Sequence, residues 1–404
     1  MPPKRSVLYI SYDGILEPLG QSQVLSYLER LAADHRIVLM SFEKPEDWAE
    51  RERRKVLRGD VRAAGITWIP LRYHRRPSAL ATAYDIARGI LVGAWLVPRH
   101  SVGIVHARSY VASVVALALK RLFGLKFVFD MRGFWADERV DGGLWPAGGR
   151  LYRAAKWFER RFLLNADRVV SLTQAAVNEI RTFPYLQGRM PRFEVITTCA
   201  DLELFRPANP KSTPPRISQP FTLGYVGSVG VWYLFDEALR CFQLLRQRVP
   251  GARLHILNRG SHEYIRERMA ALGIDENSVR LEIADHGEVA RAMQRMDAGV
   301  FFIKSVYSKI ASVPTKLGEF LGCGVPCLSN AGVGDMAGML KGEGVGVALT
   351  SFDEKAMLAG IDRLLALTRR QDIADRCRQA ALRHFSLDMG FATYDRIYRE
   401  LNPR

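Results

Sequence analysis

Short apolar runs alternate with amphipathic stretches along most of the chain. Each apolar run has the length of a strand that is buried on both faces, and the stretches between them repeat apolar residues at helical spacing. This alternation predicts parallel sheets joined by right-handed crossover helices, and therefore an α/β protein. The strands expected in the first half are residues 7–11, 37–42, 65–71, 103–107, 126–130, 168–173 and 193–197; those in the second half are 221–227, 252–258, 279–285, 300–303, 325–329 and 344–350.

One segment interrupts this alternation. Residues 206–220 are rich in proline and have no periodicity, which predicts a semi-rigid linker between two domains. In a chain of 404 residues each domain is large enough to bury its own core. We therefore expect an N-terminal domain over residues 1–205 and a C-terminal domain over residues 221–375, both of them Rossmann-like, doubly wound sheets.

The unit at residues 300–330 carries the main candidate chemistry. Pro314 fits the first turn of a helix, where a missing N–H costs nothing, and Leu317 belongs to the apolar face that follows. Lys316 and Glu319 lie opposite that face, just beyond the carboxyl end of a parallel strand, where doubly wound sheets bind ligands. A helix N-terminus and a lysine together favour phosphate. The alternative is a solvated surface ion pair.

Other polar residues also follow predicted strands. Ser228, Arg259 and His286 each come directly after a strand of the second half. Because the carboxyl ends of parallel strands meet at one edge, we expect these residues to converge with Lys316 and Glu319 on one rim. The sequence therefore predicts a ligand site at this edge.

The first half contains candidates of the same kind. Gly14 and Gly20 lie in the loop after the first strand, without the spacing of the dinucleotide-binding fingerprint. His106 and Asp130 end two later strands, and Arg132 follows in a polar, aromatic and glycine-rich segment. These residues either serve a substrate or tie down their loops by local hydrogen bonds and ion pairs.

The net charge of +16 indicates anionic partners, and sugar nucleotides, acidic lipids and nucleic acid all qualify. No nucleic-acid-binding module is visible, so nucleic acid is not expected. Residues 150–163 predict an amphipathic helix whose basic face carries Trp157; such a face either lies on an anionic membrane or is simply solvated. The core face expected for this helix consists of Leu151, Ala154, Ala155, Phe158 and Phe162.

Cysteine usage and apolar stretches bear on the compartment. Five scattered cysteines, an odd number, do not form a disulfide framework and indicate a reducing environment. No signal-peptide pattern opens the chain. Residues 78–98 are the most membrane-like stretch, but Asp85 and Arg88 interrupt it, so we expect a buried or interfacial helix there and not a span. A cytoplasmic protein, peripheral at most to the inner face of the membrane, is the expectation.

Two segments resemble a known family. The run PTKLGEFLGCGVPCLS at residues 314–329 resembles the donor site of family 4 glycosyltransferases, and SYDGILEPLGQSQVLSYLERLA at residues 11–32 resembles the N-terminal signature of a bacterial subset of that family. The resemblance extends over almost the whole chain. It implies the GT-B fold, in which two Rossmann-like domains face each other across a nucleotide-sugar cleft, with a C-terminal helical segment, here residues 376–404, that returns to the first domain.

The same resemblance implies an activity. A sugar would pass from a nucleoside-diphosphate sugar to a hydroxyl of a sugar or lipid-linked acceptor, with retention at the anomeric carbon, in polysaccharide or glycolipid synthesis. Glu319 would hold the ribose, whereas Ala311 stands where many members have a glutamate that contacts the sugar. No Asp-x-Asp motif is present, so we expect neither a metal nor a cofactor. The residues expected in donor binding are Gly14, Gly20, Gly227, Ser228, Arg259, His286, Thr315, Lys316, Leu317 and Glu319, with Gln21 nearby; those expected in catalysis are His106, Lys316 and Arg259; those expected at the acceptor are Asp130 and Arg132.

Two other functions remain open. A sugar-nucleotide epimerase with the GT-B fold would convert the donor without an acceptor. A non-catalytic basic scaffold would bind anionic lipid or polymer and no sugar nucleotide.

Overall fold

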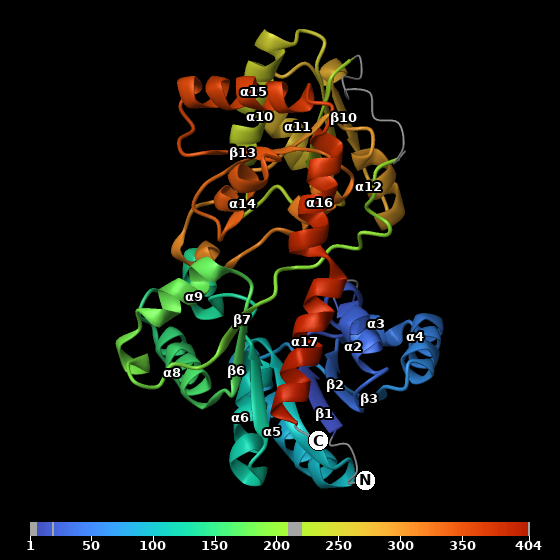
Figure 1. Cartoon of the computed structure of the whole chain (residues 1–404), viewed down its shortest axis with the longest axis vertical. Helices are drawn as coiled ribbons and strands as arrows, with labels where there is room; N and C mark the ends of the chain where they lie inside the picture. Colours follow the sequence, from blue (N-terminus) through green and yellow to red (C-terminus); the bar gives the residue numbers. More distant parts are fainter. Residues whose placement is uncertain (1–5, 18–19, 209–219, 403–404) are drawn as a thin grey trace. The chain divides into compact units, whose positions relative to one another are not determined.

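The computed structural model (Figure 1) describes residues 6–17, 20–208 and 220–402. Most of the segment predicted as a linker, residues 206–220, lies outside the described residues. The described part contains two parallel sheets with helices between successive strands, so the predicted α/β architecture is confirmed.

The first unit is built on a seven-stranded sheet in the order β3-β2-β1-β4-β5-β6-β7, and all of its strand pairs are parallel. The strand order reverses between β1 and β4. Its strands are β1 (Ser6–Ser11), β2 (Ile37–Glu43), β3 (Thr67–Arg72), β4 (Val102–Arg108), β5 (Lys126–Asp130), β6 (Arg168–Ser171) and β7 (Phe193–Val195). Its helices are η1 (Gln21–Leu25), α2 (Ser26–Leu31), α3 (Pro45–Ala49), α4 (Arg51–Ala63), α5 (Ser78–Arg99), α6 (Ser109–Phe123), α7 (Trp135–Asp141), α8 (Arg150–Asn165), α9 (Gln174–Arg181), η2 (Pro184–Leu186) and α17 (Leu387–Leu401).

The second unit is built on a six-stranded parallel sheet in the order β10-β9-β8-β11-β12-β13. This is the strand order of a Rossmann fold, with the reversal between β8 and β11. Its strands are β8 (Thr222–Val226), β9 (Arg253–Leu257), β10 (Val279–Glu282), β11 (Ala298–Val300), β12 (Cys327–Asn330) and β13 (Gly346–Leu349). Its helices are α10 (Phe235–Arg248), α11 (His262–Ala271), η3 (Glu276–Ser278), α12 (His286–Met293), η4 (Tyr307–Ala311), α13 (Thr315–Gly322), α14 (Met336–Glu343), α15 (Glu354–Thr368) and α16 (Ile373–Phe385).

The chain passes from the first unit to the second between Thr197 and Thr198, before the boundary predicted at residue 205. The residues after this point bond to the second unit, which explains the earlier boundary. For example, the Thr198 hydroxyl donates to the carbonyl of Val313 over 2.7 Å. Irregular segments such as this one carry no hydrophobic period, so their partner cannot be predicted from the sequence pattern.

The chain returns to the first unit at Leu387, later than the predicted residue 376. Helix α16 stays with the second unit because it packs closely on α13. A Cβ added to Gly318 of α13 would lie 2.7 Å from the ring of Phe385 in α16. Helix α17 alone returns, and its Tyr394 and Tyr398 reach the ends of the strands of the first sheet.

One predicted strand is wrong in its extent. The strand expected over residues 300–303 is β11, which ends at Val300. Phe301 remains fully buried outside the strand, and Ile303 makes an isolated antiparallel bridge with Tyr233. The continuous apolar run therefore reflects burial of the segment and not its strand pairing.

The amphipathic helix expected from its basic face is α8, but its buried face differs from the prediction. Leu151 and Ala154 are exposed, whereas Glu159 is fully buried. The Tyr110 hydroxyl donates to the Glu159 carboxylate, and the Lys156 ammonium pairs with it. These partners compensate for the burial of the charge, and a pattern of apolar residues alone does not reveal them.

Candidate functional site

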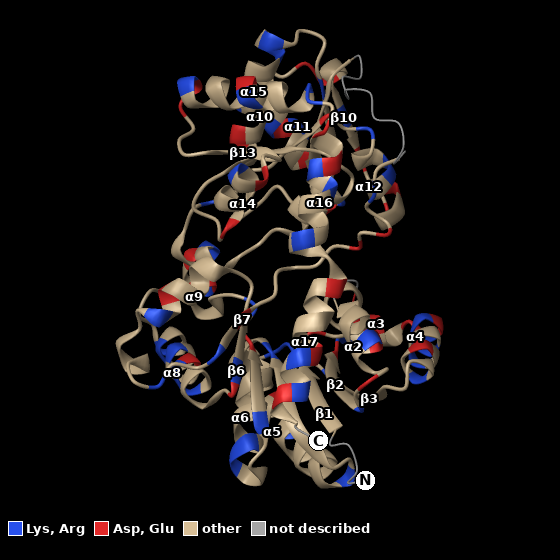
Figure 2. Ribbon diagram, in the orientation of Figure 1, with Lys and Arg blue, Asp and Glu red and all other residues tan. Residues whose placement is uncertain are grey.

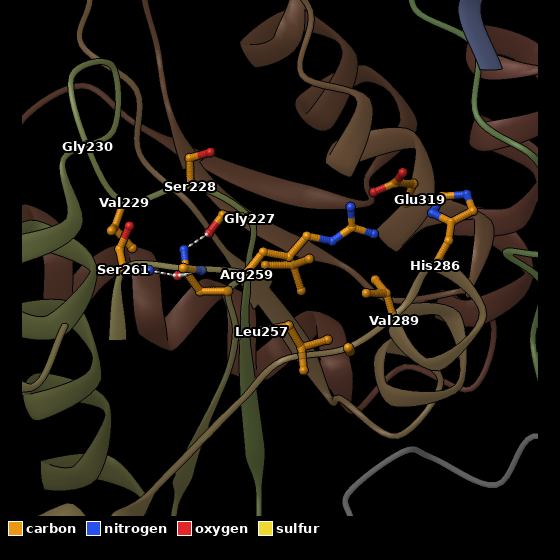
Figure 3. A pocket seen from close by; sticks show the side chains of 14 residues that line it. Gly227, Ser228, Val229, Gly230, Leu257, Arg259, Ser261, His286, Val289 and Glu319 are labelled. Atoms are coloured by element: carbon orange, nitrogen blue, oxygen red, sulfur yellow. Dashed lines mark hydrogen bonds between the residues drawn. The ribbon is translucent and has the colours of Figure 1, made fainter. Parts of the chain in front are cut away.

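A pocket in the second unit gathers residues that the sequence predicted on one rim (Figure 3). Its volume is about 360 Å³. It lies at the carboxyl ends of β8 and β9, beside the reversal of strand order where doubly wound sheets bind ligands. Its lining consists of Val226, Gly227, Ser228, Val229, Gly230, Leu257, Asn258, Arg259, Gly260, Ser261, Ala284, His286, Val289 and Glu319.

The loop after β8 forms one wall of the pocket. Gly227 has a φ of +102°, a left-handed conformation that glycine adopts without steric cost. A Cβ at this position would lie 3.0 Å from the Nζ atom of Lys316, so the side chain of another residue would also crowd the ammonium. The hydroxyl of Tyr225 donates to the carbonyl of Ser228 over 2.7 Å and fixes the turn.

Asn258, directly after β9, connects the loop after β8 to the loop after β9. Its Nδ2 donates to the carbonyl of Gly227 over 2.9 Å, and its Oδ1 accepts from the amides of Gly260 and Ser261 over 3.1 and 2.7 Å. The sequence analysis did not select Asn258. An asparagine that ends a strand before a glycine is a signal for a side chain that bonds its own loop, and this signal was available.

Lys316, in the first turn of α13, is buried beside the pocket and does not lie on the surface. Its Nζ atom lies 4.0 Å from the ring centroid of Tyr233 and 5.4 Å from that of Tyr225, which gives cation–π attraction. Among the described residues this atom has no hydrogen-bond partner. The alternative of a solvated surface pair with Glu319 is therefore wrong for the lysine.

Burial governs the ionisation of Lys316 and Glu319. It lowers the pKa of Lys316 to about 7, although the negative charge of Glu319 acts in the opposite direction. It also raises the pKa of Glu319 to about 7, although Lys316 opposes the shift. The pair is therefore poised to change its protonation near neutral pH when a charged ligand arrives.

Arg259 and His286 complete the pocket. Arg259 is exposed, and Figure 3 shows its side chain extending across the pocket toward Glu319 and His286. His286 is the first residue of α12, whose N-terminus is held by a capping box between Asp285 and Glu288. These positions place one exposed cation and one imidazole ring at the mouth of the site.

Five of the ten residues expected in donor binding line the pocket, and the other five, Gly14, Gly20, Thr315, Lys316 and Leu317, do not. Thr315 begins α13, and Leu317 is fully buried in the core. The amide of Leu317 donates to the carbonyl of Pro314 over 3.1 Å, so it already has an acceptor. Ala311, where many relatives have a sugar-contacting glutamate, is also buried.

His106, in the first unit, is sealed in the core. The ring has no exposed surface, and its Nδ1 lies 2.6 Å from the hydroxyl of Tyr398 on α17. Its Nε2 lies 3.8 Å from the Asp130 carboxylate. Burial lowers the pKa of His106, with Asp130 acting in the opposite direction. This geometry favours the alternative of a structural histidine that is hydrogen-bonded at the end of its strand.

Asp130 and Arg132 lie at the same edge of the first sheet. The Tyr394 hydroxyl donates to Asp130 Oδ2 over 3.0 Å. Burial acts to raise the pKa of Asp130, but the Arg132 guanidinium, the neighbouring His106 ring and Arg108 hold it below its usual range. Asp130 Oδ1 and Arg132 Nη1 are buried and, among the described residues, have no hydrogen-bond partner. The edge therefore combines fixed charges with unused hydrogen-bonding capacity.

Gly14 and Gly20 shape the loop after β1. A Cβ at Gly20 would lie 2.0 Å from the carbonyl of Gly14, so this position requires glycine; one at Gly14 would lie 2.6 Å from the Glu43 carboxylate and would displace it. Glu43, which the sequence analysis did not select, accepts from the amides of Ile15 and Leu16 over 3.0 and 3.1 Å. Gln21 is the first residue of η1. Glu43 thus organises a loop that the sequence predicted only from its glycines.

The described residues contain no group of three or more His, Cys, Asp or Glu side chains that is arranged to hold a metal ion. The chemistry available at the pocket is that of Lys316, Arg259, backbone amides and one carboxylate. Such a set suits an anionic ligand that also carries hydroxyl groups.

Known proteins resemble this chain in part of its sequence and in its fold. Residues 20–197 match the family model described as glycosyl transferase 4-like domain. No curated protein matches the chain in sequence. Among solved structures, a glycosyltransferase from Rickettsia africae ESF-5 is similar at a TM-score of 0.69 and 14% identity, with 100% of both chains covered. Sucrose-phosphate synthase from Thermosynechococcus elongatus is similar at a TM-score of 0.69 and 14% identity, over 98% of this chain and 99% of that one.

A third similar structure is that of HepE from Anabaena in complex with UDP and glucose. Its TM-score is 0.65 at 15% identity, over 97% of this chain and 99% of that one. These likenesses extend over both sheets and confirm the GT-B fold expected from the sequence.

Proposed function

We propose that this chain, a glycosyltransferase of the GT-B type whose first half carries a glycosyl transferase 4-like domain, transfers a sugar from a nucleoside-diphosphate sugar to an acceptor hydroxyl. The donor binds in the pocket of the second unit. UDP-sugars are the first candidates, because HepE, which is similar in structure, has been solved with UDP and with UDP-glucose.

One observation carries the proposal: the buried ammonium of Lys316 has no hydrogen-bond acceptor among the described residues. Burying an unpaired cation is costly, and the lowered pKa of Lys316 reflects this cost. The oxygens of a diphosphate beside Gly227 would supply the missing acceptors and the missing negative charge. The lysine is then a binding group for a strongly anionic ligand.

The chemistry follows from the charge that develops. When the bond between the anomeric carbon and the diphosphate oxygen breaks, the departing nucleoside diphosphate gains negative charge. Lys316 and Arg259 stabilise that charge in the pocket. The acceptor oxygen forms the new bond to the anomeric carbon, and its proton passes to a donor phosphate oxygen, on the same face of the sugar. Retention of the anomeric configuration is the stereochemical consequence.

Glu319 is proposed to accept hydrogen bonds from the ribose hydroxyls, since its carboxylate lines the pocket next to Lys316. His286, at the mouth, is proposed to lie near the base. The transfer needs no metal in this scheme, because the cations that face the leaving group are side chains.

The acceptor side is proposed to lie at the carboxyl edge of the first sheet. The unused hydrogen-bonding atoms of Asp130 and Arg132 are the support for this assignment. A sugar or lipid-linked acceptor in polysaccharide or glycolipid synthesis, handled in the cytoplasm at the inner face of the membrane, fits the basic charge of the chain.

The test is a calorimetric binding screen of UDP-, GDP-, ADP- and TDP-sugars, followed by NMR of the product formed with a panel of acceptors. We expect one nucleotide to bind best and the product to keep the donor's anomeric configuration. Conversion of the donor without an acceptor would replace transfer by epimerisation. Failure of every sugar nucleotide to bind would favour a non-catalytic scaffold.

A further inference from the structure

The solvent-facing side of α5 is apolar along its whole length. Leu80, Tyr84, Leu91 and Trp95 are between 56% and 73% exposed. Their spacing places them on a single stripe of the helix. We call this set the α5 stripe. The smaller exposed residues on the same side are Ala83, Ala87 and Pro98.

The opposite side fixes the orientation of the helix. The buried Asp85 carboxylate accepts from the Tyr12 hydroxyl over 2.9 Å and from the amide of His74 over 3.0 Å. Gly93 packs so closely on α6 that an added Cβ would lie 2.6 Å from Leu119. The helix therefore cannot rotate to hide its stripe.

Helix α6 extends the apolar surface. Gly89 of α5 faces Val115 of α6, and one turn later Gly93 faces Leu119. The two helices thus run in the same direction, and their ends lie side by side. Leu122, in the last turn of α6, is 63% exposed there.

The exposed charged residues within α5 and directly beside it in sequence are all arginines. Between residues 73 and 100 the only acidic side chain is the buried Asp85. Arg99 lies over the ring of Trp95, with 5.1 Å from its guanidinium carbon to the ring centroid. Figure 2 shows the charged residues of the chain along the same ribbon. The arginines at or near the ends and on the flank of α5 are Arg75, Arg76, Arg88 and Arg99.

We propose that α5 docks the first unit on an anionic lipid bilayer, with the stripe in the interface and the arginines on the headgroup phosphates. Amphipathic rings such as those of Tyr84 and Trp95 are favoured at the membrane–water boundary. Apolar burial together with basic flanks is the combination that holds a helix in the plane of such a surface. The partner is therefore identified as a surface that has an apolar interior and negatively charged headgroups.

Two other roles for the α5 stripe, a dimer interface and a membrane span, agree less well with the charges and contacts. A second copy of the chain, related by a two-fold axis, would bring two sets of arginines together without an exposed carboxylate to offset them.

Among the described residues α5 is the one helix that is long and apolar enough to cross a membrane, with 33% of its most apolar window buried. Its contacts with α6 and Tyr12 make it part of the α/β layer, so it lies on the membrane and does not cross it.

Helix α8 provides a matched control, because it also has a basic face and an exposed tryptophan. Trp157 is 50% exposed, close to the 56% of Trp95. Helix α8, however, exposes only two large apolar side chains among its described residues, Leu151 and Trp157, and its Lys156 is paired with Asp137 and Glu159. The sequence left α8 open as either a membrane face or a solvated face, and the exposed apolar residues are the reason for proposing α5 instead.

The experiment is flotation of the full chain with vesicles of phosphatidylcholine alone or of equal parts phosphatidylcholine and phosphatidylglycerol. We expect binding to the anionic vesicles that weakens with salt. A Leu91→Ser/Trp95→Ser double variant should lower the partition coefficient about tenfold or more. A Trp157→Ser variant should bind like the wild type. Circular dichroism and thermal unfolding confirm that each variant is folded.

Equal vesicle binding by the wild type and the α5 double variant would overturn the proposal, as would no binding of the wild type at low salt. A dimer in light scattering that Leu91→Glu dissociates would assign the stripe to a second copy and likewise overturn it. The inference does not rest on the proposed function, because UDP binding and vesicle binding are separate readouts.

Discussion

Replacing Lys316 by methionine tests the candidate site most directly, because it should change stability and nucleotide binding in opposite directions. Methionine keeps the length and apolar body of the side chain but removes the ammonium. If the lysine is a binding group held in an unfavourable place, the variant should be more stable and bind nucleotide less well. A structural ion pair would lose stability instead.

The magnitudes follow from the structure. The pKa of Lys316 falls from its ordinary 10.5 to about 7, and one pKa unit corresponds to about 1.36 kcal/mol, so protonation in the folded state costs roughly 5 kcal/mol. Removing the lysine also leaves Glu319 without its neighbouring cation, which offsets part of that gain. We expect a net increase of about 1–2 kcal/mol in the free energy of unfolding, visible as a melting temperature a few degrees higher.

The effect on binding comes from the lost contact with the diphosphate. Charge-assisted hydrogen bonds contribute roughly 1.5–3 kcal/mol, which corresponds to roughly a ten- to hundredfold loss in affinity. The assay is calorimetric titration of UDP, or of the nucleotide that the screen selects, together with thermal unfolding. Lys341→Met, on the exposed end of α14, is the matched control and should change neither quantity.

Two results would refute the reasoning. A Lys316→Met protein that binds the nucleotide like the wild type would remove the lysine from the site. A variant that is clearly less stable would show that the ammonium has a structural partner, so that its burial is compensated within the protein. A further variant, Glu319→Gln, should weaken nucleotide binding through the loss of ribose contacts. It distinguishes the contribution of Glu319 from that of Lys316.

Further predictions concern the same pocket. Asn258→Ala leaves the carbonyl of Gly227 and two amides without partners, so it should cost about 1–3 kcal/mol of stability and weaken UDP binding, both measured as above; unchanged affinity would contradict the role of Asn258 in shaping the pocket. At pH 8, above its pKa of about 7, Lys316 is mostly neutral, and the diphosphate should raise its pKa. UDP binding should then take up a proton, whereas Glu319 is already mostly ionised at that pH. The dependence of the binding enthalpy on buffer ionisation measures this uptake, which Lys316→Met should abolish. Sugar transfer should persist in EDTA; loss of activity that manganese or magnesium restores would contradict the scheme.

The fold followed from the sequence because its signals are local and repeated. Each buried strand is a short apolar run, and each is followed by helical spacing, so the two sheets and their edge of polar residues were predictable. Ser228, Arg259 and Glu319 meet in the pocket because they follow parallel strands. Topology alone brings such residues together, whatever lies between them in the chain.

The burial of individual side chains at the site was not predictable in this way. Helical spacing placed Lys316 away from the core face, but Tyr225 and Tyr233, contributed by β8 and the loop after it, cover its ammonium. His106 lies in β4, two residues before the end of the strand, and Tyr398 from the far end of the chain seals it. Burial of this kind depends on segments that are distant in sequence, and no local pattern reports it.

The order of the first six strands is the same in both sheets, which explains why the candidate residues cluster as they do. In each sheet the order reverses next to the first strand, between β8 and β11 in one and between β1 and β4 in the other. At this reversal neighbouring loops diverge to opposite faces and leave room for a ligand. In the loop after β8, Gly227 lies against the ammonium of Lys316. In the loop after β1, the Glu43 carboxylate accepts a hydrogen bond from the amide of Ile15. This topology supports our proposal of a donor site beside the reversal between β8 and β11 and of an acceptor site at the carboxyl edge of the first sheet.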